Sequence, residues 1–565
     1  MEAVRIALGC MRLSTDPDRD EERSAATIRV ALDAGIRVFD TARAYGRDDG
    51  ELGHNERLLA TVLRAHGAPE TRIVTKGGMR RPSGGWEPDG RARTVREDCE
   101  ASLEALGGLP IDLYLLHAPD PRVPWLTSVR ALAQLVHAGL VRRVGLSSVN
   151  RRRLDEALTV APIAAVEIAL GPFADEALRG GVVARCIERG IEVLAHSPLG
   201  GPERAARLAR HPELAGPATR LGVSPQRVVL EALCELHPTI VPVVGARRPE
   251  TVAACVTPGT LDDAERAAIE ARYGWRSILR PPEAPVEADG EVVLVMGVQG
   301  AGKSTLAARW VERGYVRINR DERGGSMKSL HAALDATLAA GAREVVADNT
   351  YTTRAARQGA IAVARRRGAR VSGVWLDTSV VEAQRNVILR MLDTHGRLLE
   401  PDEMQRARDP SSIGPGALWR LLRAVEPPSA DEGFATLETV PFLRENTGVG
   451  RAATFVAIDA AKSLARDTGE VVLVFGWRPL ATQEDGAELG RRLGVPVMCC
   501  AHPAGPPRCW CRPPLPGLLL ALAREHGVDI ARSVVVGTSE AHARMATALG
   551  ARYRSAPPSE VSPPG

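Results

Sequence analysis

The first half of the chain alternates eight times between a short apolar run and a stretch with helical spacing. Continuous apolar runs are typical of parallel strands that are buried on both faces of their sheet. Helical stretches such as Arg23–Ala34, Glu56–Ala65, Arg93–Leu106 and Val123–His137 separate the runs. Eight alternations in about 270 residues predict a (β/α)8 barrel. We expect its strands at Val4–Gly9, Val38–Thr41, Arg72–Lys76, Asp112–His117, Arg142–Ser148, Ala164–Leu170, Glu192–Pro198 and Thr239–Gly245.

The rest of the chain is too long to share that core, because 565 residues correspond to three or four domains of average size. Residues 275–290 are rich in proline and acids and predict a linker, and residues 444–452 form a weaker break. Strand–helix alternation continues after both, which predicts an α/β multidomain protein. We expect the barrel in residues 1–274, the linker in 275–290, a second α/β domain in 291–443, a third in 444–555 and a disordered tail in 556–565.

Composition limits the classes of protein that remain. With 44% hydrophobic and 25% charged residues, the chain resembles an ordinary globular protein and not a disordered or collagen-like one. It has no run of about 18 uncharged apolar residues, so we expect neither a membrane span nor a membrane partner. The first residues lack the pattern of an export signal, which predicts a cytoplasmic protein. A net charge of +4 is too small to indicate a nucleic-acid partner by itself.

Lysine is rare in this chain, which has four lysines among its 73 basic residues. Only lysine offers a compact, titratable amine, so a lysine that persists among arginines is a candidate for chemistry. The four are Lys76, Lys303, Lys328 and Lys462.

Polar side chains gather at the expected ends of three barrel strands, where the active sites of such barrels lie. Asp40 ends the second strand, with Tyr45 in the loop that follows, Lys76 ends the third and His117 ends the fourth. An ammonium group stabilises a phenolate, and a carboxylate holds the ammonium in place. A phenol in this setting suits proton transfer to a carbonyl oxygen that the histidine orients.

With this tetrad, GHNE at 53–56 and HSPLGG at 196–201, residues 1 to about 272 resemble an aldo-keto reductase. The resemblance implies hydride transfer from NADPH to a small carbonyl substrate, with the tetrad as the catalytic residues. It implies that Arg247, in GARRPE, contacts the 2′-phosphate of adenosine. The cofactor-binding positions that it implies are Ser147, Ser148, His196, Ser197, Leu199, Gly245 and Arg247.

Several cofactor positions depart from the pattern of that family. GLSS at 145–148 stands where Ser-Asn is usual, Glu167 stands where a glutamine is usual, and His196 replaces an aromatic residue that would stack on the nicotinamide. Ala254 and Cys255 replace a polar pair. These departures predict weaker or altered cofactor binding, whereas Lys76 predicts an active enzyme.

GVQGAGKS at 297–304 fits the phosphate-binding loop G-x-x-x-x-G-K-[ST], between an expected strand at Glu291–Met296 and an expected helix at Ser304–Arg313. Its backbone N–H groups predict an ATP site, with Lys303 on the β and γ phosphates and Ser304 on Mg²⁺. The ATP-binding positions are Gly297, Gly300, Ala301, Gly302, Lys303, Ser304 and Thr305.

Residues after this loop indicate the phosphate acceptor. Asp321 follows the next expected strand, where a base for an attacking hydroxyl is needed, and Arg385 and Arg390 lie on a helix that can close over ATP. With DNT at 348–350 and DEGFATLETVPF at 431–442, the segment resembles the kinase domain of 5′-hydroxyl polynucleotide kinases. The resemblance implies Asp321 as general base, Arg390 as lid arginine and 5′-hydroxyl ends of RNA or DNA as partners. Gly324 stands where the phage-type enzyme has an arginine for the 3′ phosphate.

Cys500, His502, Cys509 and Cys511 form two close pairs that suit a closed, tetrahedral Zn²⁺ site, with Cys499 as an alternative first ligand. The segment resembles the zinc-bearing branch of the haloacid dehalogenase phosphatases. Most of the catalytic aspartates of that branch are missing, however. Of their four positions, at best one holds a carboxylate, Asp459, and the other three hold Ala461, Thr538 and His542. We therefore expect a degenerate, inactive phosphatase domain.

Together these observations predict a bifunctional enzyme that phosphorylates 5′-hydroxyl ends with ATP and reduces a carbonyl compound with NADPH. One alternative is a kinase for a small metabolite fused to a reductase. The other is a binding protein that senses nucleotide or NADPH. The sequence specifies no oligomeric state.

Overall fold

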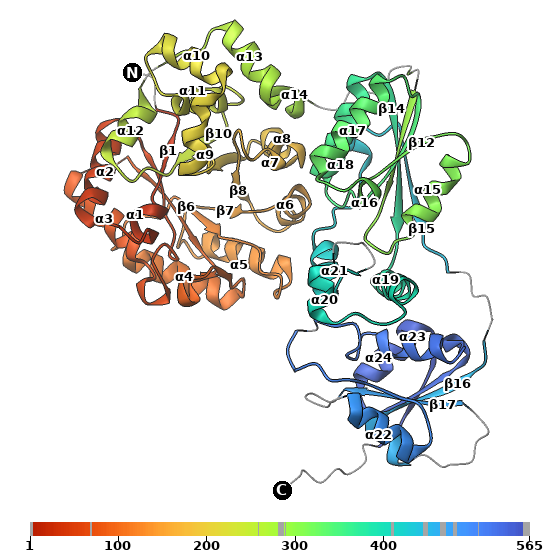
Figure 1. Cartoon of the computed structure of the whole chain (residues 1–565). Helices are drawn as coiled ribbons and strands as arrows, with labels where there is room; N and C mark the ends of the chain where they lie inside the picture. Colours follow the sequence, from red (N-terminus) through yellow and green to blue (C-terminus); the bar gives the residue numbers. More distant parts are fainter. Residues whose placement is uncertain are drawn as a thin grey trace. The chain divides into compact units, whose positions relative to one another are not determined.

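The computed structural model describes residues 4–67, 70–257, 259–280, 288, 290–407, 412–444, 450–463, 471–477, 483–506 and 508–557. The chain forms two compact units, residues 1–281 and 282–565 (Figure 1). None of the helices in the described part of the chain has the length and apolar character needed to cross a membrane.

The first unit contains a closed barrel of eight parallel strands in the order β1-β10-β9-β8-β7-β6-β3-β2. All eight strands expected from the apolar runs are confirmed. They are β1 (Ala7–Gly9), β2 (Val38–Asp40), β3 (Arg72–Gly77), β6 (Leu113–Leu116), β7 (Arg143–Ser147), β8 (Ile163–Ala169), β9 (Glu192–His196) and β10 (Ile240–Val244).

Helices surround the barrel strands, as Figure 1 shows. One set of apolar side chains, including Val74, Leu113 and Leu194, fills the barrel interior, and a larger set packs between strands and helices. The covering helices are α2 (Glu21–Asp33), α3 (His54–His66), α4 (Ala92–Ala105), α5 (Trp125–His137), α6 (Arg151–Leu158), α8 (Val182–Arg189), α10 (Pro212–Leu221), α11 (Pro225–Cys234), α12 (Pro249–Val256) and α13 (Asp263–Tyr273).

The barrel unit extends beyond its expected end at residue 274. Trp275–Leu279, expected in the linker, form helix α14, because the Trp275 ring is buried and stacks on Tyr273 with 4.8 Å between ring centroids. Most of the remaining linker (281–287 and 289) and part of the second break (445–449) lie outside the described residues. So do residues 558–565 of the expected tail, whereas Ala556 donates its N–H to the carbonyl of Gly537.

The second unit begins with a parallel sheet in the order β12-β13-β11-β14-β15. Helix α15 (Lys303–Val311) packs on one face, and α17 (Met327–Ala339) and α18 (Arg354–Arg366) pack on the other. Both faces are therefore covered, which explains the continuous apolar strands. The strands are β11 (Gly290–Met296), β12 (Val316–Asn319), β13 (Glu344–Asp348), β14 (Ala369–Asp377) and β15 (Thr436–Pro441).

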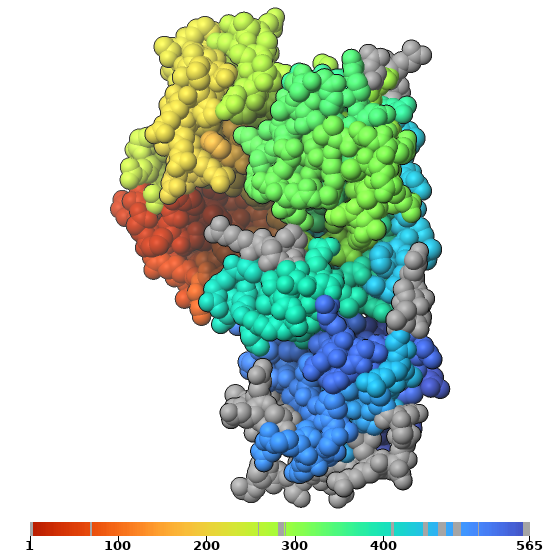
Figure 2. Space-filling view, turned by 45° about the vertical axis from the view of Figure 1, so that its right-hand side comes forward, coloured from red at the N-terminus to blue at the C-terminus, as the bar shows by residue number. Residues whose placement is uncertain are grey.

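A second parallel sheet follows, in the order β18-β17-β16-β19-β20, which agrees with the strand–helix alternation expected in this segment. Its core is shared with helices that follow β14: α19 (Val380–His395), α20 (Pro401–Arg406) and α21 (Pro415–Arg423). Figure 2 shows the atoms of this helical segment, in teal, against those of the last domain, in blue. The strands and the main helices of this domain are β16 (Ala453–Ala457), β17 (Val471–Trp477), β18 (Val497–Cys500), β19 (Val534–Gly537), β20 (Arg552–Ser555), α22 (Gln483–Leu493), α23 (Gly517–Glu525) and α24 (Glu540–Leu549).

Candidate active sites

The barrel brings the expected tetrad together at the carboxyl ends of its strands. The ammonium Nζ of Lys76 lies 2.5 Å from Oδ1 of Asp40 and 3.0 Å from the phenol oxygen of Tyr45. It also lies 3.1 Å from Oε2 of Glu167 on β8. Lys76, Asp40, Tyr45 and Glu167 are all at least 95% buried. Two carboxylates, those of Asp40 and Glu167, therefore meet one ammonium group in a site that is shielded from water.

Burial dominates the proton affinities of these groups. Burial and the charge of Glu167 raise the pKa of Asp40 to about 7. Burial acts to lower the pKa of Lys76, but the charges of Asp40 and Glu167 outweigh it and raise that pKa well above its usual value. Burial raises the pKa of the Tyr45 phenol above its usual value. The charge of Lys76 acts to lower this pKa, as expected, but the effect of burial is larger. The Tyr45 phenol therefore stays protonated in this site.

His117 completes the site from the end of β6, with its ring centroid 5.7 Å from that of Tyr45 in an edge-to-face arrangement. Its Nδ1 atom is buried and has no hydrogen-bond partner within the described residues. Burial and the charge of Lys76 lower the pKa of His117 well below its usual value, so the imidazole is neutral. Trp86, which no sequence motif marks, contacts both rings, with its ring centroid 6.3 Å from that of Tyr45 and 5.7 Å from that of His117.

The expected cofactor positions also lie at strand ends. Ser147 is the last residue of β7 and His196 the last of β9. Ser148 and Ser197 follow them with φ of 59° and 52°, a left-handed conformation that disfavours a serine by about 1–2 kcal/mol. Burial lowers the pKa of His196 to about 4, so its ring is neutral. Leu199 and Gly245 lie in the loops after β9 and β10.

Arg247, expected to hold the 2′-phosphate of adenosine, is neutralised by acids in this structure. Its Nη1 atom lies 2.8 Å from Oδ2 of Asp16 and 2.8 Å from Oδ1 of Asp18. A phosphate would have to compete with these carboxylates for the guanidinium. No sequence pattern marks this pairing, because the acids lie more than 200 residues earlier in the chain.

The phosphate-binding loop joins β11 to α15 as expected. Gly300 has a φ of 81°, and a Cβ there would lie 2.5 Å from the carbonyl oxygen of Ala383 on α19, so only glycine fits. Asn386 on α19 donates a hydrogen bond to the Gly300 carbonyl at 2.7 Å. Lys303 Nζ donates to the carbonyl of Val298 at 2.8 Å across the loop. The remaining expected positions, Gly297, Ala301, Gly302 and Thr305, belong to the same strand–loop–helix segment.

Charged groups converge on Lys303. Burial lowers the pKa of Lys303 to about 8. The charges of Asp321 and Asp348 act to raise this pKa, and the charge of Arg390 acts to lower it further. The charges of the expected base, Asp321, and of the expected lid arginine, Arg390, thus both act on the loop lysine. Ser304 Oγ donates to Oδ2 of Asp348 at 3.2 Å, at the carboxyl end of β13. A serine hydroxyl beside a carboxylate is the donor set that Mg²⁺ uses in phosphate-binding loops.

Comparisons with known proteins agree with both geometries. Residues 5–273 match the Aldo/keto reductase family, and residues 292–409 match the AAA domain family. An aldo/keto reductase domain is present, followed by a P-loop AAA domain. The expectation of a (β/α)8 barrel with a P-loop α/β domain after it is therefore confirmed.

Solved structures that resemble the reductase domain include two aldo-keto reductases and a glycerol dehydrogenase. A thermostable aldo-keto reductase is 25% identical, with 47% of this chain and 94% of that chain covered and a TM-score of 0.40. An aldo-keto reductase from Bacillus halodurans is 24% identical, with 48% and 92% covered and a TM-score of 0.39. A glycerol dehydrogenase from Gluconobacter oxydans is 24% identical, with 50% and 95% covered and a TM-score of 0.40.

In the last domain, the potential ligand atoms of Cys500, His502, Cys509 and Cys511 all lie within 4.8 Å of one another. The sulfurs of Cys500 and Cys509 are 3.7 Å apart, and Nδ1 of His502 is 3.3 Å from the sulfurs of Cys500 and Cys511. Metal–sulfur bonds of about 2.3 Å in a tetrahedron give sulfur separations of about 3.8 Å, so the donor set fits Zn²⁺. Cys500, and not its neighbour Cys499, belongs to this cluster.

The other nitrogen of His502 is held by the AAA domain. Its Nε2 lies 2.7 Å from Oε2 of Glu400, immediately before α20. A carboxylate on the second nitrogen of a metal-binding histidine fixes the ring and its tautomer. Trp510, between two of the cysteines, is 1% exposed and donates its Nε1–H to the carbonyl of Ile413 at 2.9 Å. The cysteine cluster is therefore packed against the helices that follow the P-loop sheet.

Proposed function

We propose that the aldo/keto reductase domain reduces a small carbonyl compound with NADPH. The observation that carries this proposal is the contact set of Lys76, which pairs with Asp40 at 2.5 Å and reaches the Tyr45 oxygen at 3.0 Å. A buried, protonated phenol beside an ammonium group can act as a proton donor, because the ammonium group stabilises the phenolate that forms when the proton is transferred.

NADPH supplies the hydride for the carbonyl carbon when it is bound. Tyr45 gives its proton to the carbonyl oxygen, and Lys76 stabilises the phenolate that remains. Asp40 holds Lys76, and neutral His117 orients the carbonyl. Ser148 and Ser197, strained at the ends of β7 and β9, support a nucleotide site, because such strain persists where a ligand needs the backbone in that conformation. Gly245, beside Arg247, leaves open space where a side chain would project.

Turnover of a panel of aldehydes and ketones with NADPH tests this proposal. We expect consumption of NADPH by the parent protein and a loss of at least a hundredfold in Lys76→Met, since the phenolate loses its counter-charge. A protein that reduces no carbonyl compound, or a Lys76→Met variant with the parent rate, would contradict it.

We propose that the AAA domain transfers the γ-phosphate of ATP to 5′-hydroxyl ends of RNA or DNA. The charges of Asp321 and Arg390 that act on Lys303, with Ser304 beside Asp348, support this. Asp321 takes the hydroxyl proton, and Lys303, Arg390 and Mg²⁺ on Ser304 stabilise the transferring phosphoryl group. The cysteine cluster holds a structural Zn²⁺ in a degenerate phosphatase domain.

Labelled ATP, Mg²⁺ and 5′-hydroxyl oligonucleotides of RNA and DNA test the kinase. We expect label on the 5′ end and its loss in Lys303→Ala and Asp321→Asn, but not in Lys328→Ala, whose lysine is exposed on α17. Transfer to sugars instead would favour a metabolite kinase. ATP binding without transfer to either acceptor would favour a sensor.

A further inference from the structure

Among the described residues, no carboxylate forms an ion pair with one arginine at the rim of the reductase site. Arg81 and Trp86 lie between the two short strands of a hairpin, β4 (Met79–Arg80) and β5 (Glu87–Pro88), that follows β3. The Arg81 side chain is buried, at 5% exposure for the residue, and its Cζ lies 3.8 Å from the centroid of the Trp86 ring. The same ring contacts Tyr45 and His117. One aromatic ring thus joins the guanidinium to the catalytic groups.

The hydrogen bonds of the Arg81 guanidinium are incomplete. Its Nε atom is buried without a partner in the described part of the chain. Nη1 and Nη2 reach the carbonyls of Gly85 and Arg47 at 3.3 Å each, beyond the usual range of N–H···O distances. A buried cation with weak neutral acceptors is costly unless an anion completes the site.

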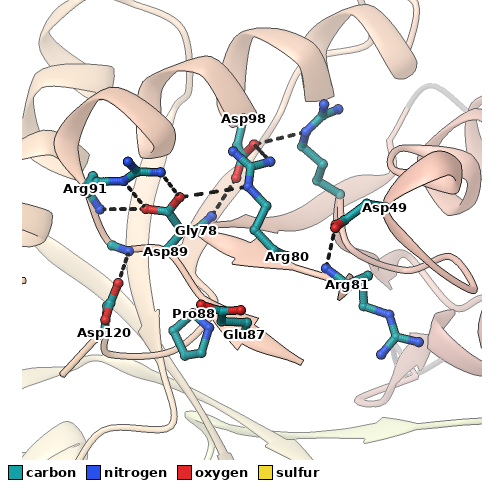
Figure 3. Close-up of polar contacts among 12 residues, drawn as sticks. Asp49, Gly78, Arg80, Arg81, Glu87, Pro88, Asp89, Arg91, Asp98 and Asp120 are labelled. Atoms are coloured by element: carbon teal, nitrogen blue, oxygen red, sulfur yellow. Dashed lines mark hydrogen bonds and ion pairs between the residues drawn. The ribbon is translucent and has the colours of Figure 1, made fainter. Parts of the chain in front are cut away.

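Neighbouring arginines of the same hairpin region differ in this respect, as Figure 3 shows. Arg80 pairs with Asp98 at 3.3 Å and Arg91 with Asp89 at 2.5 Å. Arg81, by contrast, is hydrogen-bonded to Asp49 only through its backbone N–H. The charges of Asp49 and Asp48 act on its guanidinium, but no carboxylate of a described residue lies within ion-pair distance of it. Its charge nevertheless acts on the catalytic centre, since it contributes to the lowered pKa of His117.

We propose that Arg81 and Trp86 form a subsite for an anionic group of the carbonyl substrate, a carboxylate or a phosphate. The carbonyl lies between Tyr45 and His117, the body of the substrate packs on the Trp86 ring, which is 46% exposed, and the anion completes the hydrogen bonds of Arg81. A planar guanidinium suits such a group, because it can donate two parallel hydrogen bonds to it. The inference rests on the proposed reductase function and names its substrate class.

Pairs of aldehydes that differ in charge test the subsite. The carboxylate pair is 4-carboxybenzaldehyde and its neutral methyl ester, and the phosphate pair is glyceraldehyde 3-phosphate and glyceraldehyde. We expect kcat/KM to favour the anionic member of at least one pair by about tenfold to a hundredfold, the range for hydrogen bonds to charged groups. The pair that shows the preference identifies the anion.

Arg81→Met should remove that preference, Arg81→Lys should keep part of it, and Arg91→Met, whose arginine is already neutralised by Asp89, should leave it unchanged. Equal rates for the charged and neutral members of both pairs in the parent protein, or an unchanged preference in Arg81→Met, would overturn the proposal.

Benzoate and inorganic phosphate separate failure of the subsite from failure of the reductase. If no aldehyde is reduced, the proposed function fails, and binding of these two anions, measured by calorimetry, decides the subsite. Binding of at least one anion that weakens about tenfold or more in Arg81→Met supports it. Equal binding to both proteins, or no binding of either anion to the parent, overturns it.

Discussion

The ammonium group of Lys76 lies 3.1 Å from the carboxylate of Glu167, in addition to its pair with Asp40. The buried site therefore contains two carboxylates and one ammonium, an excess of one negative charge when all three are ionised. An uncompensated buried charge destabilises a fold. Burial and the charge of Glu167 raise the pKa of Asp40 to about 7, so Asp40 takes up a proton below neutral pH and the excess negative charge is removed.

Glu167→Gln should stabilise the protein in a pH-dependent way. Because the pKa of Asp40 is higher in the folded protein than in the unfolded chain, its contribution to stability is lost as the pH rises through about 7. Removing the second carboxylate lowers that pKa. We expect the Tm of the barrel to rise by about 2–6 °C at pH 8 and by much less at pH 5. Glu176→Gln, at an exposed position of the same barrel, is the control, and a pH-independent difference would contradict the account.

Asp18→Asn should favour NADPH over NADH. Asp18 and Asp16 both lie 2.8 Å from Arg247, so they compete with a 2′-phosphate. Asp18 is largely exposed, and its loss is therefore worth about 1 kcal/mol or less. We expect NADPH affinity to rise by up to about fivefold and NADH affinity to stay constant, as measured by cofactor fluorescence. Glu22→Gln serves as control. Equal changes in the affinities for NADPH and NADH would show that the 2′-phosphate does not bind at Arg247.

The adjacent cysteines Cys499 and Cys500 provide a matched pair for the metal site. The sulfur of Cys500 lies 3.7 Å from that of Cys509, whereas Cys499 is not a member of the four-residue cluster. We expect one zinc per chain by elemental analysis, loss of zinc in Cys500→Ser and retention in Cys499→Ser. Equal metal content in the two variants would contradict the assignment.

Zinc removal should also loosen the contact between the last domain and the AAA domain. His502 and Trp510 bond to Glu400 and Ile413 from within the cluster, so they lose their fixed positions when the metal is released. A chelator should therefore increase hydrogen exchange in α20 and α21 and leave the barrel strands unaffected. Unchanged exchange in these helices would show that the cluster does not support them.

Local patterns in the sequence predicted the elements and groups that depend on neighbouring residues. The apolar runs predicted all eight barrel strands, and the strand ends predicted the meeting of Lys76, Asp40 and Tyr45. In the same way, the glycine-rich loop predicted the position of Lys303 after β11.

Contacts between distant residues, and the effects of burial, were not predictable in this way. Asn386 meets Gly300 across 86 residues, and Glu400 meets His502 across 102. Neither pair has a spacing that marks it in the sequence. Arg81 looks like one of many arginines until the structure shows that acids neutralise Arg80 but not Arg81. The raised pKa of Tyr45 likewise depends on exclusion of water, which residue types alone do not give.

Substitution of Tyr45 by phenylalanine tests the central claim most directly. The measurement is kcat for NADPH-dependent reduction of the best aldehyde, alongside the dissociation constant of NADPH. We predict a fall in kcat of about 10² to 10⁴, the contribution of a positioned acid, with NADPH binding unchanged and Tyr273→Phe as an active control. A Tyr45→Phe variant with the kcat of the parent protein would contradict the assignment of Tyr45 as the proton donor.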